Sequence, residues 1–150
     1  MKFNLNLKNK MNNNNNISNM KRKLLWISDY GYSGYTLVTN CLLKSIITYF
    51  DVYLLVINTS QKRNEILKNL SNNKLEIPED NVFNVDTVKS LSDRDIKQLF
   101  GYFKLPYILN KINPDIIISI NDQQILSKQL ESIKKCLLWD GITIAYMPVD

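Results

Sequence analysis

Residues 23–50, KLLWISDYGYSGYTLVTNCLLKSIITYF, decide the fold of this chain. Residues 23–28 form a short apolar run without alternation, which predicts a strand buried on both faces. Residues 29–35 supply a turn, and residues 36–50 place apolar side chains at the spacing of an amphipathic helix. A second apolar run at 52–57 completes a strand–loop–helix–strand unit that is long enough for a parallel crossover.

The same alternation continues to the end of the chain. Pro106 has no amide donor, so it must interrupt or restart the helix in which it lies. Strands that alternate with helices, each strand apolar throughout, predict an α/β domain with a Rossmann-like parallel sheet and helices on both faces. The expected elements are a helix at 60–70 capped by Ser60, a strand at 82–85, a helix from 92 to about 103, a strand at 116–120, a helix at 123–135 and a strand at 142–147.

Composition limits the chemistry that the chain can perform. With 150 residues, the chain is long enough for one compact domain. It contains no histidine, which excludes a Ser-His-Asp triad and histidine metal sites. Its two cysteines, Cys41 and Cys136, are too few for a disulfide framework and are expected to be small apolar fillers in a reduced setting. We expect no metal site.

The net charge of +5 belongs to one end of the sequence. Six of the 19 basic residues precede residue 24, and the remaining 13 face all 14 acidic residues. We therefore expect no nucleic-acid binding. Residues 1–22 are predicted to be a disordered, Asn-rich basic leader that reflects an AT-rich genome, and residues 23–150 to be the domain. No run suits a signal peptide or a membrane span, so a cytoplasmic location is expected.

Candidate site residues follow the predicted strands, because ligands of open parallel sheets bind outside the carboxyl ends of the strands. Gly31, Ser33 and Gly34 lie between a strand and a helix, where glycine allows close backbone approach and the helix amino terminus favours phosphate. Their spacing matches neither the dinucleotide nor the P-loop fingerprint, so a tight turn remains the alternative. Three neighbouring tyrosines either stack on a sugar or base or pack over the loop: Tyr30, Tyr32 and Tyr35.

Two further strand exits carry polar side chains. Asn121 and Asp122 follow the strand at 116–120, and Asp150 follows the last strand. If these strands are neighbours, Asp122 and Asp150 face one cleft. Asp122 is otherwise a helix cap, and Asp150 is otherwise a chain end.

Three segments together resemble a known family. KLLWISDYGYSGYTLVTNCLLKSI at 23–46, INPDIIISINDQQIL at 112–126 and ITIAYMPVD at 142–150 resemble the amino-terminal, acceptor-side domain of family-4 glycosyltransferases with the GT-B fold. The resemblance covers residues 23–150. The order and spacing of the motifs carry it, since each motif alone is loose.

The resemblance implies roles for the candidate residues. Gly31, Ser33 and Gly34 would lie near the phosphates of a nucleotide-sugar donor. Asn121 and Asp122 would lie on the acceptor side of the cleft, and Asp150 would be a catalytic or acceptor-orienting carboxylate. The nucleotide-sugar would be a co-substrate, and no other cofactor is implied.

The family's second, nucleotide-binding domain has no counterpart in this sequence. A hexosyltransferase of this kind is therefore expected to be inactive alone, as a truncated or split product, and to need a donor-binding domain on a separate chain. Two other functions stay open. One is a non-catalytic Rossmann-like binding or interaction protein that self-associates through an unfinished sheet. The other is a small flavodoxin-like domain that binds a nucleotide or flavin.

Overall fold

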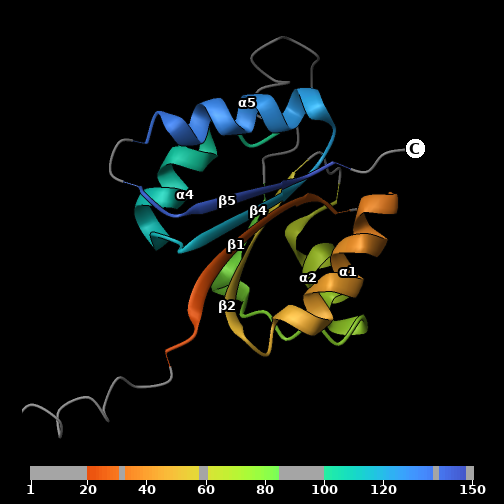
Figure 1. Ribbon diagram of the computed structural model, residues 1–150. Helices are drawn as coiled ribbons and strands as arrows, with labels where there is room; N and C mark the ends of the chain where they lie inside the picture. The colour runs from red at the N-terminus through yellow and green to blue at the C-terminus, as the bar shows by residue number, and fades with distance from the viewer. Residues whose placement is uncertain (1–19, 31–32, 58–60, 85–99, 137–138, 148–150) are drawn as a thin grey trace, which may run out of the picture.

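A five-stranded parallel sheet forms the centre of the molecule (Figure 1). The computed structural model describes residues 20–30, 33–57, 61–84, 100–136 and 139–147. Its elements are β1 (Arg22–Asp29), α1 (Gly34–Ile46), β2 (Phe50–Ile57), α2 (Arg63–Asn72), the 3-10 turn η2 (Glu79–Asn81), β3 (Val82–Asn84), α4 (Lys104–Ile112), β4 (Ile116–Ile120), α5 (Gln123–Lys134) and β5 (Ile142–Tyr146).

The strand order is β3-β2-β1-β4-β5, and every neighbouring pair is parallel. The chain builds outward from β1 to β3, crosses back, and then builds outward on the other side of β1 through β4 to β5. The order therefore reverses between β1 and β4, as in a Rossmann-like sheet. The predicted fold class is confirmed.

Helices cover both faces of the sheet (Figure 1). Leu24 and Trp26 of β1 belong to a buried cluster on the face of α1 and α2. Leu25 and Ile27 point the other way and pack with residues of α4 on the face of α4 and α5. All four side chains are almost fully buried, which explains why β1 is apolar without alternation.

The first helix is shorter than predicted and begins earlier. It was expected at 36–50, but α1 covers Gly34–Ile46. Ile47 N donates to Leu43 O at 2.9 Å and Tyr49 N donates to Ile46 O at 2.9 Å, so the chain turns directly after the helix. Phe50 then pairs with Arg22 as the first residue of β2. An apolar run at helical spacing does not show where the chain turns into a strand.

The start of the second helix also differs from the prediction. The expected cap, Ser60, lies outside the described residues, and the position before α2 is held by Lys62. Its backbone N–H donates to Glu65 Oε2 at 3.2 Å, so the carboxylate of an acid in the first turn satisfies the N–H of the residue before the helix.

The prediction for Pro106 is confirmed. Helix α4 begins two residues before it, so the proline lies in the first turn, where its missing N–H removes no intrahelical bond. The part of the expected helix at 92–99 lies outside the described residues. None of the described helices is long and apolar enough to cross a bilayer.

Burial differs from the expectation in two places. The sheet was expected to be covered by helices on both faces, yet Ile142, Ile144 and Tyr146 of β5 are about half exposed, because no described helix covers this part of the sheet on the α1 side. Cys41, expected to be an apolar filler, is exposed on α1, whereas Cys136 is half-buried.

Candidate functional site

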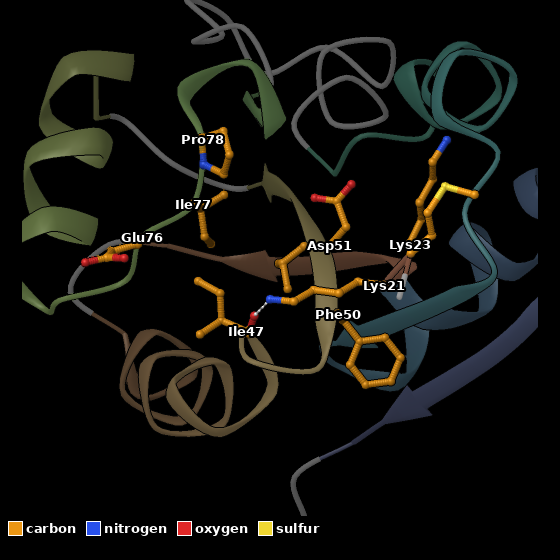
Figure 2. A pocket seen from close by; sticks show the side chains of 10 residues that line it. Lys21, Lys23, Ile47, Phe50, Asp51, Glu76, Ile77 and Pro78 are labelled. Atoms are coloured by element: carbon orange, nitrogen blue, oxygen red, sulfur yellow. Dashed lines mark hydrogen bonds between the residues drawn. The ribbon is translucent and has the colours of Figure 1, made fainter. Parts of the chain in front are cut away.

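A hollow of about 430 Å³ lies at the amino-terminal edge of the sheet (Figure 2). Three of the charged groups around it, those of Lys21, Lys23 and Asp51, have hydrogen-bond partners within the fold. Lys21 Nζ donates to Ile47 O at 3.1 Å, and Lys23 Nζ donates to a carbonyl of α4 at 3.0 Å. Asp51 accepts hydrogen bonds from Asn81 and Tyr53, each at 3.2 Å. Because ligands of parallel sheets bind at the opposite edge, this hollow is not the candidate site.

The candidate site is the switch-point edge, where the strand order reverses at the carboxyl ends of β1 and β4. Helix α1 begins there on one face of the sheet, and α5 begins there on the other (Figure 1). The polar or small residues that mark this edge are Asp29, Tyr30, Ser33, Gly34, Asn121 and Asp122.

A hydrogen bond joins the two sides of the switch-point edge. The hydroxyl of Tyr35, in the first turn of α1, donates to Asp122 Oδ1 at the start of α5. Asp122 does occupy the N-cap position of α5, as predicted, but its side chain makes no capping bond. Its carboxylate serves α1 instead, and a carboxylate can accept further hydrogen bonds.

Asn121 has an unpaired buried group. The residue is 2% exposed, and its Nδ2 has no hydrogen-bond partner among the residues that the structure describes. Its backbone N–H donates to Tyr146 O at 3.2 Å, which fixes the residue between β4 and β5. An unsatisfied buried amide costs about 1 to 3 kcal/mol, and such groups in native proteins call for an explanation such as a bound ligand.

The start of α1 is open. A Cβ added to Gly34 would meet no atom within 4 Å. Ser33 is the N-cap residue, but it makes no side-chain capping bond, and its Oγ lies 3.4 Å from Thr36 Oγ1. No acidic side chain lies in the first turn, so none there neutralises the positive end of the helix dipole.

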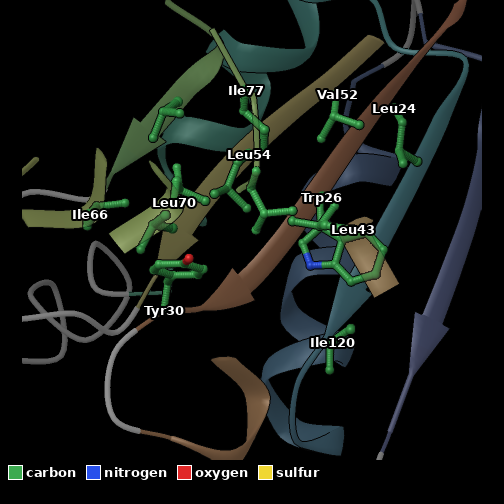
Figure 3. Close-up of a cluster of buried hydrophobic side chains, with 13 residues drawn as sticks. Leu24, Trp26, Tyr30, Leu43, Val52, Leu54, Ile66, Leu70, Ile77 and Ile120 are labelled. Atoms are coloured by element: carbon green, nitrogen blue, oxygen red, sulfur yellow. The ribbon is translucent and has the colours of Figure 1, made fainter. Parts of the chain in front are cut away.

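Buried hydrogen bonds hold α1 against β1 behind this edge (Figure 3 shows Trp26 and Tyr30 in the cluster). Trp26 Nε1 donates to Thr39 Oγ1 at 3.2 Å, and the Thr39 hydroxyl donates to Ser28 Oγ at 2.8 Å. Tyr30 donates to Asn40 Oδ1 at 2.9 Å. Sequence reasoning missed Thr39 and Asn40, although two adjacent polar residues inside an apolar helix face were a signal for such bonds.

Burial decides the role of Tyr30. Desolvation raises the pKa of its phenol to about 12, and the bond to Asn40 only partly opposes this effect. The side chain therefore stays protonated at neutral pH and packs in the core. Of the two alternatives for Tyr30, its burial in the core excludes stacking on a sugar or base.

Four of the predicted site residues meet at the switch-point edge. Ser33 and Gly34 stand at the start of α1, and Asn121 and Asp122 at the end of β4. Gly31 and Asp150 lie outside the described residues, as does Tyr32. Within the described ranges, no group of three or more metal-ligating side chains is close enough to hold an ion.

Comparisons with known proteins support the fold. No protein-family model matches the chain, and no curated protein sequence does. Two crystal structures of the carboxy-terminal domain of a hydrogenase from Pyrococcus furiosus are similar to it. One has a TM-score of 0.56 at 14% identity and covers 85% of this chain and 94% of that domain. The other has a TM-score of 0.57 at 13% identity and covers 84% and 92%.

These neighbours overturn the resemblance to glycosyltransferases. The two solved structures named above are hydrogenase domains, and at such low identity they establish the fold alone. An apolar strand, a glycine turn and a polar strand exit are features of any parallel α/β sheet, so their order describes the fold and not that family. Glycosyl transfer rested on the resemblance and loses that support.

Proposed function

We propose that the chain binds a nucleotide at the switch-point edge, with the phosphate at the start of α1 and a sugar hydroxyl at Asp122. The observation that carries the proposal is the position of Gly34 and of the Asn121–Asp122 pair on either side of the reversal in strand order. This is the general ligand position of open α/β sheets.

The chemistry of the two sides is complementary to a nucleotide. The open amino terminus of α1 favours an anion. The Asp122 carboxylate repels an anion but accepts hydrogen bonds from hydroxyls, so it suits a ribose or ribityl group. The unpaired Nδ2 of Asn121 is a donor for a ligand oxygen. A ligand that offers phosphate and hydroxyls within one molecule satisfies both sides.

Calorimetric titration of the full chain with AMP, ADP, FMN and inorganic phosphate tests the proposal. At least one nucleotide is expected to bind more tightly than inorganic phosphate, and a flavin would also colour the purified protein yellow. Absence of binding by every nucleotide in the set would reject the proposal.

Position Gly34 provides a charge test with a matched control. Asp at this position adds a negative charge on a Cβ that meets open space, while Asn has the same shape and no charge. Gly34→Asp is expected to weaken nucleotide binding by about tenfold through repulsion at the helix terminus, and Gly34→Asn to change it little. Equal affinities for the two variants would place the phosphate elsewhere.

A substitution at Asn121 distinguishes a ligand-binding role of this residue from a structural role. Asn121→Leu removes the unpaired amide, so the free protein is expected to gain about 1 kcal/mol in free energy of unfolding while nucleotide binding weakens. Urea unfolding and titration of the same variant measure the two effects. A more stable variant with unchanged affinity would remove Asn121 from the site.

A further inference from the structure

The two edges of the sheet differ in how well they are protected. Edge strand β3 has only three residues. Edge strand β5 has five, Ile142–Tyr146, and its sequence ITIAY contains neither a charge nor a proline. Natural sheets usually guard their edges with short strands, lysine or proline, because an unguarded edge pairs with another strand. β5 has none of these features.

The outer side of β5 carries unpaired backbone groups in the described part of the chain. Ile142 N donates to Asp115 O at 3.0 Å, and Tyr146 O accepts from Asn121 N at 3.2 Å. Even-numbered residues of β5 therefore bond to β4. Because backbone groups alternate along a strand, those of Thr143 and Ala145 point outward.

The same strand exposes apolar side chains. Ile142 is 58% exposed, Ile144 is 47% exposed and Tyr146 is 48% exposed. By their register with β4, all three side chains lie on the same face of the sheet as α1. Helix α1 does not extend over them. An occupant of this edge must therefore satisfy outward backbone groups and also offer apolar side chains on the same face.

We propose that two copies of this chain pair through β5, antiparallel, about a two-fold axis at Ile144, and so form one continuous sheet. In this register Thr143 exchanges two backbone hydrogen bonds with Ala145 of the second copy, and Ala145 does the same with Thr143. Ile144 lies beside Ile144 of the second copy, and Ile142 lies beside its Tyr146. Cross-strand pairs of β-branched and aromatic residues are favourable.

A second copy fits this edge because the edge is its own complement. Every outward donor meets an outward acceptor under the two-fold axis, and every exposed apolar side chain meets another. No charge in β5 is brought against a like charge.

Sedimentation of the full chain over a wide concentration range tests the dimer. A dimer that dissociates on dilution is expected, because a five-residue edge is small beside a standard interface. Ile144→Lys puts two ammonium groups on the axis and is expected to weaken the dimer at least about tenfold. Tyr107→Lys is the control, since Tyr107 is an exposed residue of α4, which packs on the opposite face of the sheet, and it is expected to leave the dimer unchanged.

Disulfide formation tests the register without a charge change. In a chain with Cys41→Ser and Cys136→Ala, Ile144→Cys is expected to give an interchain disulfide on mild oxidation, because facing residues on the axis lie within disulfide reach. Ile142→Cys is the control and is expected to form little interchain disulfide, because its cross-strand neighbour is Tyr146.

Four outcomes overturn the proposal. The first is a chain that stays monomeric at every concentration. The second is a monomer whose Thr143 and Ala145 amides are protected from hydrogen exchange, since another part of the same chain would then cover the edge. The third is a dimer that is indifferent to Ile144→Lys. The fourth is equal crosslinking at positions 142 and 144, which excludes the axis at Ile144.

Discussion

Tyr30 directly follows β1, with its ring in the core and its hydroxyl bonded to Asn40. Burial raises the pKa of this phenol to about 12, whereas an unfolded chain titrates it near 10. The folded state thus disfavours the tyrosinate. Tyr30 contributes stability that is complete below pH 10 and is lost as pH rises through 10 toward about 12.

The first prediction concerns this loss. Two pKa units correspond to about 2 to 3 kcal/mol, so the free energy of unfolding is expected to fall by about that amount between pH 10 and 12 on account of Tyr30. Urea unfolding across this pH range measures it. Tyr30→Phe is expected to flatten the pH dependence, while Tyr49→Phe, at a tyrosine that is 74% exposed, should leave it unchanged. Equal slopes for the wild type and Tyr30→Phe would contradict the prediction.

Individual residues also show where sequence reasoning stops. The positions of Ser33, Gly34, Asn121 and Asp122 at one edge follow from the rule that ligand residues succeed strands. The bond from Tyr35 to Asp122 does not, because it joins positions 87 residues apart and depends on how α1 and α5 begin on opposite faces. The periodicity of a sequence reports on neighbouring residues only, so it cannot predict a contact between residues so far apart in the chain.

At the level of elements, the turn into β5 is held by tight packing at Gly141. A Cβ at this position would lie 2.5 Å from the Trp139 ring and 2.8 Å from Asp115 O. The indole cannot move freely, because its Nε1 donates to Pro114 O at 2.7 Å. Gly141 therefore allows the chain to pass between this ring and the backbone before β5.

The second prediction follows from that contact. Gly141→Ala is expected to lower the free energy of unfolding by about 1 to 3 kcal/mol, because the ring or the backbone must shift. Gly34→Ala is the matched control, since its added Cβ meets open space, and it is expected to be neutral or slightly stabilising. Thermal or urea unfolding compares the two. A neutral Gly141→Ala would show that the turn relaxes without cost.

The elements themselves were largely predictable, but their burial was not. Residues 116–120 and the start of α5 at Gln123 agree with the structure, because a β-branched run and a following polar turn are local signals. Exposure of β5 was missed since an apolar run looks the same on a central strand and on an edge strand. Sheet position depends on pairing between distant segments, which hydrophobic periodicity does not encode.

At the level of the whole molecule, β1 and β2 supply side chains to both buried clusters. Leu54 of β2 belongs to the cluster on the α1 side, and its neighbour Leu55 belongs to the other. Both clusters therefore depend on the backbone hydrogen bonds that join β1 to β2. Neither face of the sheet has strands of its own that would let it fold separately, so the domain is expected to unfold in one step.

The third prediction uses the two tryptophans, one on each face. Trp26 is buried on the α1 side, and Trp139 packs against the cluster of α4. Trp139→Phe leaves Trp26 as the reporter, and Trp26→Phe leaves Trp139. In each variant, fluorescence is expected to give the same urea midpoint as circular dichroism. A separate midpoint for either tryptophan would show that one face melts independently.

The strand order has a consequence for synthesis on the ribosome. Lys23 N donates to Asp115, 92 residues later, so β1 cannot pair with β4 until the residues between them have been made. At about 5 to 20 residues per second, that wait lasts roughly 5 to 20 seconds. During this time the apolar strand at 24–28 can pair on only one side. We therefore expect the nascent chain to bind holding chaperones, and we expect fast overproduction to yield aggregates that slower translation avoids.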